Sequence, residues 1–165
     1  MHLVQTYLVA ARERLIDAQI LFAEGRNDAS CYLAGYVVEM LLKHAAMTVA
    51  GAGPTDSTDV WRSYFWTTFV KSKAVSANFH SGHGLGFWAR ALDSIRRTTT
   101  LGPLAKRWQR RLDAAVQTAT KSWAVDMRYD GPSRGAKAAA TLLAIAGWLF
   151  NNHARLVRQR GRKCR

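Results

Sequence analysis

Hydrophobic residues recur along this chain at steps of three and four, the spacing of one face of an α-helix. The pattern is clearest in roughly residues 2–24. The apolar face there consists of Val4, Leu8, Ala11, Leu15, Ala18 and Phe22. Gly25 follows, at the place where many helices end in a left-handed residue. The pattern predicts a first helix that stops at Gly25.

A second apolar stripe predicts a helix that runs to about Ala50, with Gly51 as its stop. The stripe consists of Leu33, Val37, Met40 or Leu41, His44 and Met47. Asp28 or Ser30 is the expected N-terminal cap, because short polar side chains accept from the first free backbone N–H groups. The connection over residues 25–27 is short, so the first two helices are expected to pack antiparallel.

Four further helices are expected over roughly residues 59–75, 85–95, 104–123 and 134–158, with a loop at 79–86 and breaks at 102–103 and 130–132. The residues expected to face inward in the last two are Leu104, Trp108, Leu112, Ala115 and Ala119, then Leu142, Ile145, Leu149 and Leu156. No segment alternates as a strand does, and no repeat is present. The prediction is an all-α, antiparallel up-and-down bundle of five or six helices, forming one domain over residues 1–158.

Length and composition fit one folded domain, since 165 residues with 48% hydrophobic content can bury a core. The first residues have no basic patch before an apolar run, which predicts no secretory signal. The longest nearly apolar run, residues 138–150, is shorter than the roughly 20 residues that cross a bilayer. Cys31 and Cys164 lie in unlike settings and make no disulfide framework. A soluble cytoplasmic protein without membrane contact is expected.

Charge changes the picture, because 24 Lys and Arg against 11 Asp and Glu give a net +13. A polyanion is the obvious partner for such a chain. The candidate polyanion-binding residues form two clusters: Lys106, Arg107, Arg110 and Arg111, then Arg158, Arg160, Arg162 and Lys163. The second cluster extends into a basic tail, residues 159–165. The competing interpretation is a solvated helix face followed by a frayed tail.

Motifs for catalysis or cofactor binding are absent from the sequence. It has no Gly-rich phosphate loop, no Ser-His-Asp set and no carboxylate pair at a usable spacing. His80 and His83 alone make an incomplete zinc set. No metal site and no cofactor is therefore predicted.

The predicted second helix, residues 31–43 with the sequence CYLAGYVVEMLLK, resembles the signature helix of the HEPN domain family, whose name refers to higher eukaryotes, prokaryotes and nucleotide binding. The first helix before Gly25 and the segment 82–85 are similar to other parts of that domain. Trp123 followed by Arg128 and Tyr129 resembles the element before its last helix. Residues 53–79 lie outside the resemblance and are interpreted as an insert.

The resemblance implies a helical bundle, often a homodimer, that acts on nucleic acid or serves as a partner, commonly beside a nucleotidyltransferase in toxin–antitoxin pairs. Six Trp residues in so small a bundle also favour a dimer, because apolar surface that a monomer leaves exposed often marks an interface. Ribonuclease members of the family carry Arg, four to six residues and then His. No arginine of this chain is followed by His at that spacing.

Five residues are candidates for ligand binding: Glu39, Lys43, His83, Arg128 and Tyr129. Glu39 and Lys43 share a helix face at i and i+4, either as a structural pair or as the lining of a groove. Arg128 suits phosphate and Tyr129 suits a base, and the competing interpretation is a helix-capping Arg and a core Tyr. The leading hypothesis is a non-catalytic, dimeric HEPN-type protein that binds nucleotide, RNA or a companion protein. The alternative is a divergent ribonuclease that uses Arg128 and His83.

Overall fold

The computed structural model of the chain describes residues 3–71, 83–128 and 134–158, and this part forms an all-α helical bundle. Six α-helices follow one another: α1 (Thr6–Ala23), α2 (Asn27–Val49), α3 (Thr58–Phe65), α4 (Leu85–Thr98), α5 (Lys106–Ser122) and α6 (Ala136–Val157). The π-helix η1 (Trp66–Lys71) continues α3, and the 3-10 helix η3 (Val125–Arg128) precedes α6. The predicted fold class is confirmed.

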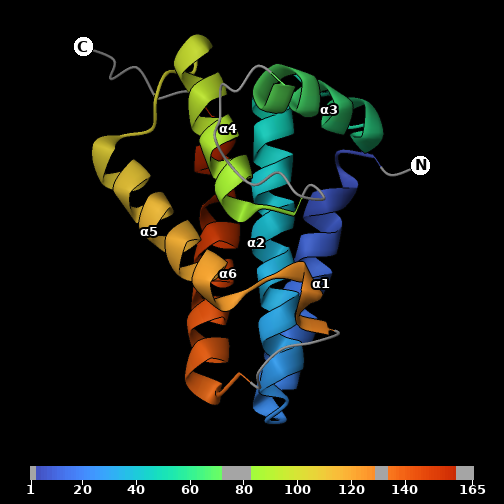
Figure 1. Cartoon of the computed structure of the whole chain (residues 1–165), viewed down its shortest axis with the longest axis vertical. Helices are drawn as coiled ribbons and strands as arrows, with labels where there is room; N and C mark the ends of the chain where they lie inside the picture. The colour runs from blue at the N-terminus through green and yellow to red at the C-terminus, as the bar shows by residue number, and fades with distance from the viewer. Residues whose placement is uncertain (1–2, 72–82, 129–133, 159–165) are drawn as a thin grey trace.

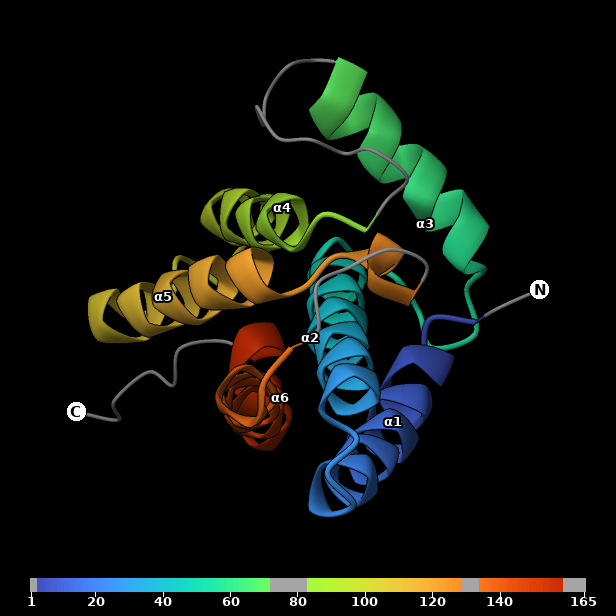
Figure 2. The same ribbon diagram turned by 60° about the horizontal axis from the view of Figure 1, so that its bottom comes forward.

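Helix α2 is the centre of the bundle, with α1, α4 and α6 packed around it (Figures 1 and 2). Fifteen of its 23 residues are buried, far more than a single stripe would bury. The apolar stripe predicted for this segment is therefore too narrow. A helix that contacts neighbours on several sides is buried on each of them, and amphipathic spacing shows only the most apolar side.

Neighbouring helices run mostly in opposite directions. Figure 1 shows α1 running down and α2 running up, as the short connection predicts, and later α5 running down beside an ascending α6. Helix α3 lies across one end of the bundle, whereas α4 begins beside the middle of α2, where His83 meets Glu39, and runs the same way as α2. The up-and-down order is interrupted at α3, within the segment interpreted as an insert.

Two predicted stops and one predicted cap can be compared with the helix ends. Gly25 and Gly51 have φ of 73° and 105°, so both occupy the left-handed region that favours glycine. The cap prediction is wrong, because Asp28 and Ser30 lie inside α2 and the residue before that helix makes no side-chain cap. The Ser30 hydroxyl instead donates to the backbone carbonyl of Ala18 at 2.8 Å and joins α2 to α1.

The aromatic segment after residue 58 departs from the regular helix predicted for 59–75. Helix α3 ends at Phe65, and the wider π-helix follows through residue 71. Residues 72–82, which include part of the expected helix and loop, lie outside the described residues. Phe65 and Phe69 stack at 5.5 Å between ring centroids, and Phe65 lies 4.9 Å from Trp88 of α4. The change from α-helix to π-helix therefore coincides with ring packing against another helix. The spacing of apolar residues within the segment does not show such a contact.

The end of α5 is held against α2 at a glycine. A Cβ added to Gly35 would lie 2.0 Å from the ring of Trp123, so no larger side chain fits there unless the ring moves. The Trp123 indole N–H donates to the backbone carbonyl of Tyr32 at 3.0 Å. Most inward predictions for α5 and α6 are confirmed by burial: Leu104, Leu112, Ala119, Leu142, Leu149 and Leu156.

Arg96 of α4 is buried, with 1% of its surface exposed, although arginine is rarely found in a core. Its guanidinium donates to the carbonyl of Leu156 at 2.5 Å, to that of Arg158 at 3.3 Å and to that of Leu101 at 3.4 Å. The last carbonyls of a helix have no partner within it, and a cation there also suits the helix dipole. Arg96 therefore anchors the C-terminal end of α6 to α4.

Candidate functional site

A buried carboxylate connects three of the five predicted ligand-binding residues. The side chain of Glu39 on α2 is 2% exposed and forms an ion pair with Lys43, whose side chain is 7% exposed. His83, just before α4, places its Nδ1 3.0 Å from both carboxylate oxygens of Glu39. The pair predicted at i and i+4 is thus buried, and the structure adds His83 to it across 44 positions of sequence.

Aromatic rings surround this cluster. The Lys43 ammonium lies 5.6 Å from the ring centroid of Trp88 and 6.0 Å from that of Tyr7. The rings of Tyr36 and His83 meet edge to face at 6.2 Å. Ring faces carry partial negative charge and replace part of the water that a buried ammonium loses. The surroundings therefore favour a charged Lys43 paired with Glu39.

The carboxylate determines which nitrogen of His83 carries hydrogen. An ionised carboxylate accepts but cannot donate, so Nδ1 is the donor toward Glu39. In the neutral ring Nε2 is then left with a free lone pair. The Tyr7 hydroxyl lies near the same charge, and burial first and the Glu39 carboxylate second raise its pKa. The cluster thus contains a positioned imidazole and a phenol that stays protonated.

A cavity of about 350 Å³ opens beside the cluster, between α1, α2, α3 and His83. Its lining residues are Thr6, Tyr7, Ala10, Met40, Lys43, Thr58, Asp59, Arg62 and His83. Arg62 is 3.7 Å from Asp59 in a pair whose two side chains are 48% and 72% exposed, so this contact restrains it weakly. The arrangement can hold a small polar group between hydroxyls, an imidazole and a cation.

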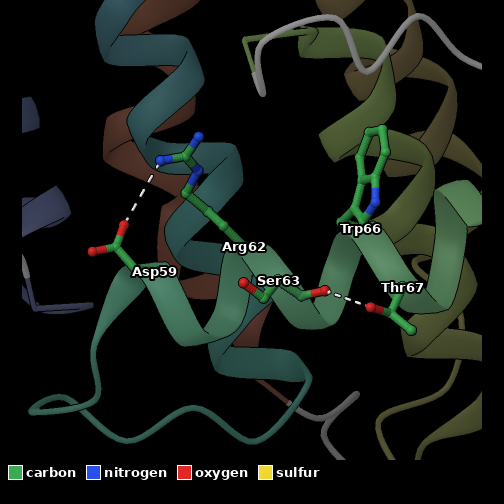
Figure 3. A pocket seen from close by; sticks show the side chains of 5 residues that line it. All are labelled: Asp59, Arg62, Ser63, Trp66 and Thr67. Carbon is green, nitrogen blue, oxygen red and sulfur yellow. Dashed lines mark hydrogen bonds and ion pairs between the residues drawn. The ribbon is translucent and has the colours of Figure 1, made fainter.

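Arg62 also borders a second hollow, of about 410 Å³, on the outer side of α3 and η1. Figure 3 shows Arg62 and Trp66 rising from the same side of the helix, one turn apart. Below them the Thr67 hydroxyl donates to the Ser63 carbonyl at 3.0 Å. This hollow is shallow and bordered by exposed side chains, so it makes a weaker candidate than the cavity.

Basic charge is concentrated on another part of the molecule, α5 and α6. Helix α5 carries five Lys or Arg side chains, Lys106, Arg107, Arg110, Arg111 and Lys121, against one acidic residue, Asp113. Helix α6 contains no Asp or Glu. Among the described residues, none of these five cations forms an ion pair. By contrast, α1 has two Arg against one Glu and one Asp.

Two tryptophans and two arginines form a four-layer stack on this face. Trp108 of α5 and Trp148 of α6 stack at 5.1 Å with 20° between their planes. The Arg111 guanidinium lies 4.7 Å from the Trp148 ring centroid, and that of Arg155 lies 5.1 Å from the Trp108 centroid. We call this set the Arg–Trp ladder. An arginine stacked on a ring keeps the N–H groups of its edge free to donate.

The remaining predicted site residues fall at or beyond the limits of the described chain. Arg128 is the last residue of η3, and Tyr129 lies outside the described residues, so their relation to His83 stays a prediction. Arg158 is exposed, and its carbonyl accepts from Arg96. Arg160, Arg162 and Lys163 lie outside the described residues.

Several functional candidates escaped the sequence reading. Tyr7, Arg62 and Trp88 reach the Glu39 cluster from three other elements, and no local spacing signals that. Trp108 and Trp148 are 40 positions apart, although the basic residues beside Trp108 were a usable signal. No group of three or more metal-ligating side chains occurs in residues 3–71, 83–128 and 134–158.

Comparisons with known proteins add no relative. No family model, no curated protein and no solved structure matches this chain. Within the described part, no helix combines the length and apolar character that crossing a membrane requires.

Proposed function

We propose that this chain is a HEPN-like, dimeric protein that binds RNA through the basic face of α5 and α6 and leaves it intact. The observation that carries this proposal is the Arg–Trp ladder, set among cations that form no ion pair within the described part of the chain. Phosphates need donors that are not already satisfied, and Arg is suited to bind them through its planar fork. The resemblance of residues 31–43 to the HEPN signature helix is the second support.

Charge segregation argues against a merely solubilising role. If the positive excess served only solubility, it would need no particular location on the surface. Instead α5 carries five basic residues with one acidic residue, while α1 is balanced. A one-sided field of this kind steers polyanions and orients them on one face.

The test is the salt dependence of RNA binding, followed by fluorescence anisotropy. Each phosphate contact contributes roughly 0.7 to 0.9 to the slope of log affinity against log salt. The double variant Arg111→Gln/Arg155→Gln should weaken binding and lower the slope by about 1 to 2. The control double variant Arg12→Gln/Arg26→Gln removes the same charge from exposed sites elsewhere. Equal losses in both, or no binding at low salt, contradict the proposal.

The basic tail is tested separately. Removing residues 159–165 should lower the salt slope further, because four of these residues are basic. The deletion should begin after Arg158, because the carbonyl of that residue accepts from Arg96 and its loss would disturb the end of α6. An unchanged slope would limit the RNA-binding surface to α5 and α6.

Homodimerisation is part of the proposal and has its own support. Val9, Ile16 and Ile20 of α1 are 60%, 48% and 53% exposed, and their spacing places them on one side of the helix. A second copy of the chain would cover this stripe. Light scattering of wild type and Ile16→Glu should give a dimer and a monomer, respectively. A monomeric wild type at micromolar concentration contradicts it. A companion protein such as a nucleotidyltransferase is the other partner proposed for the exposed surface.

The alternative function is RNA cleavage, favoured by the way Glu39 orients His83 beside a cavity. We expect none. The other two described histidines, His44 and His153, pack against each other between α2 and α6, and His153 is buried and unavailable to RNA. RNA incubated with EDTA should stay intact with wild type, Arg128→Ala and His83→Ala alike. Turnover that persists through purification and vanishes in both variants would make the protein a ribonuclease.

A further inference from the structure

We infer that the groove between α4 and α5 takes the unstacked bases of single-stranded RNA, so that the RNA bound on the basic face is single-stranded. This inference rests on the proposed function and specifies its substrate. The groove has a volume of about 740 Å³. It lies between α4 and α5, whereas the Arg–Trp ladder lies between α5 and α6, so the two features flank α5, which Figure 2 shows between α4 and α6.

The lining of the groove combines apolar and basic groups. Ala89 of α4 and Val116 of α5 are buried lining residues, each with 6% of its surface exposed. Arg90, Arg110 and Lys121 border the same groove, and none of the three forms an ion pair within the described residues. A nucleotide base is a flat ring with apolar faces, and in a strand it is flanked by phosphates. It therefore matches both the apolar and the basic part of the lining. A duplex cannot use the apolar part, because its bases are already stacked and paired.

One carboxylate in the groove favours this orientation. Asp113 lines the groove, and one of its oxygens accepts from the side-chain amide of Gln109 at 2.9 Å. A carboxylate repels phosphate and accepts from the amino groups of bases. Phosphates are therefore held at the basic edges and bases enter the groove.

Helix α5 contributes side chains both to the groove and to the Arg–Trp ladder. Arg110 borders the groove, and the next residue, Arg111, belongs to the Arg–Trp ladder. Successive helix residues are about 100° apart, so the two arginines project from different sides of the ridge that α5 forms, Arg110 toward the groove and Arg111 toward Trp148 of α6. A strand that crosses this ridge can place phosphates on both. A protein partner would have to match the basic edges with acidic side chains, and the test includes that case.

The experiment compares three ligands of equal length with the full chain: an oligoadenylate, an abasic strand with the same sugar–phosphate backbone, and an RNA duplex. The described lining of the groove contains no aromatic ring, so a base gains there by burying apolar surface against alanine and valine side chains. Burial of roughly 60 Å² of a base corresponds to about tenfold in affinity. The oligoadenylate should bind at least about tenfold tighter than the abasic strand and tighter than the duplex, at one salt concentration. Ala114→Leu, which fills the groove without changing charge, should abolish that advantage and leave abasic binding unchanged. Ala23→Leu, at an exposed position of α1 outside the groove, is the matched control.

The outcomes separate the inference from the proposed function. Equal, salt-sensitive binding of all three ligands overturns the inference and leaves polyanion binding intact. An Ala114→Leu variant that behaves like Ala23→Leu also overturns it. An acidic peptide that binds the wild type and is lost with Ala114→Leu assigns the groove to a protein partner instead. No binding of any strand at low salt removes the proposed function itself.

Discussion

Acid should destabilise this protein through a pair of histidines, one buried and one half-buried. His44 of α2 and His153 of α6 meet edge to face at 4.9 Å between ring centroids. His153 is 7% exposed, and its Nε2 is buried without a hydrogen-bond partner among the residues that the structure describes. Burial first and the neighbouring His44 second lower the pKa of His153 to about 4, against a hydrogen bond with the Leu41 backbone that acts in the other direction. Burial also lowers the pKa of His44.

The sign follows from proton uptake. The unfolded chain binds a proton at this histidine near pH 6.5, whereas the folded chain resists it until about pH 4. Stability is therefore fully present above pH 6.5 and falls as the pH drops toward 4. At about 1.36 kcal/mol per pKa unit, the loss assigned to His153 is about 3 kcal/mol. His44 adds to it in the same direction. Domains of this kind are stable by only about 5–15 kcal/mol, so the loss is large.

Urea unfolding at pH 7 and at pH 4, with wild type and His153→Leu, measures this loss. The carboxylates titrate in both proteins, so their shared contribution cancels in the comparison. Wild type should lose about 3 kcal/mol more than the variant between the two pH values. His44→Gln should raise the pKa of His153 in an NMR titration, because a neighbouring imidazole is removed. A His153 pKa near 6.5, or the same pH dependence in wild type and His153→Leu, would refute this reasoning.

Two substitutions test other contacts. Gly35→Ala places a Cβ 2.0 Å from the Trp123 ring and should lower the free energy of unfolding by about 1–3 kcal/mol. The control Gly147→Ala, where a Cβ would meet no atom within 4 Å, should be neutral or stabilise by up to about 1 kcal/mol. Equal melting temperatures of the two variants would contradict the packing argument. Glu39→Gln leaves the Lys43 ammonium buried without its carboxylate. The free energy of unfolding, measured with denaturant, should fall by about 3–5 kcal/mol. A loss below about 1 kcal/mol would mean that water surrounds the pair.

The sequence alone determined the helical class, most helix positions and several helix ends. These features depend on local physics: apolar residues at helical spacing predict a buried face, and glycine after a helix predicts a left-handed stop, as at Gly25 and Gly51. The same reasoning failed at the start of α2, where Ser30 bonds to another helix rather than to its own end. It also failed after Phe65, where ring packing against α4 accompanies a π-helix.

Tertiary structure decided what surrounds each candidate residue. The sequence placed Glu39 and Lys43 on one face but left open whether water or protein surrounds them, and only the position of α2 at the centre of the bundle buries the pair. His83 joins it from 44 positions away, and Trp108 meets Trp148 from 40 positions away. Spacing along a chain reports neighbours within a helix, since these are separated by three or four residues. Contacts between helices depend on how whole elements pack, and no short window of sequence contains that information.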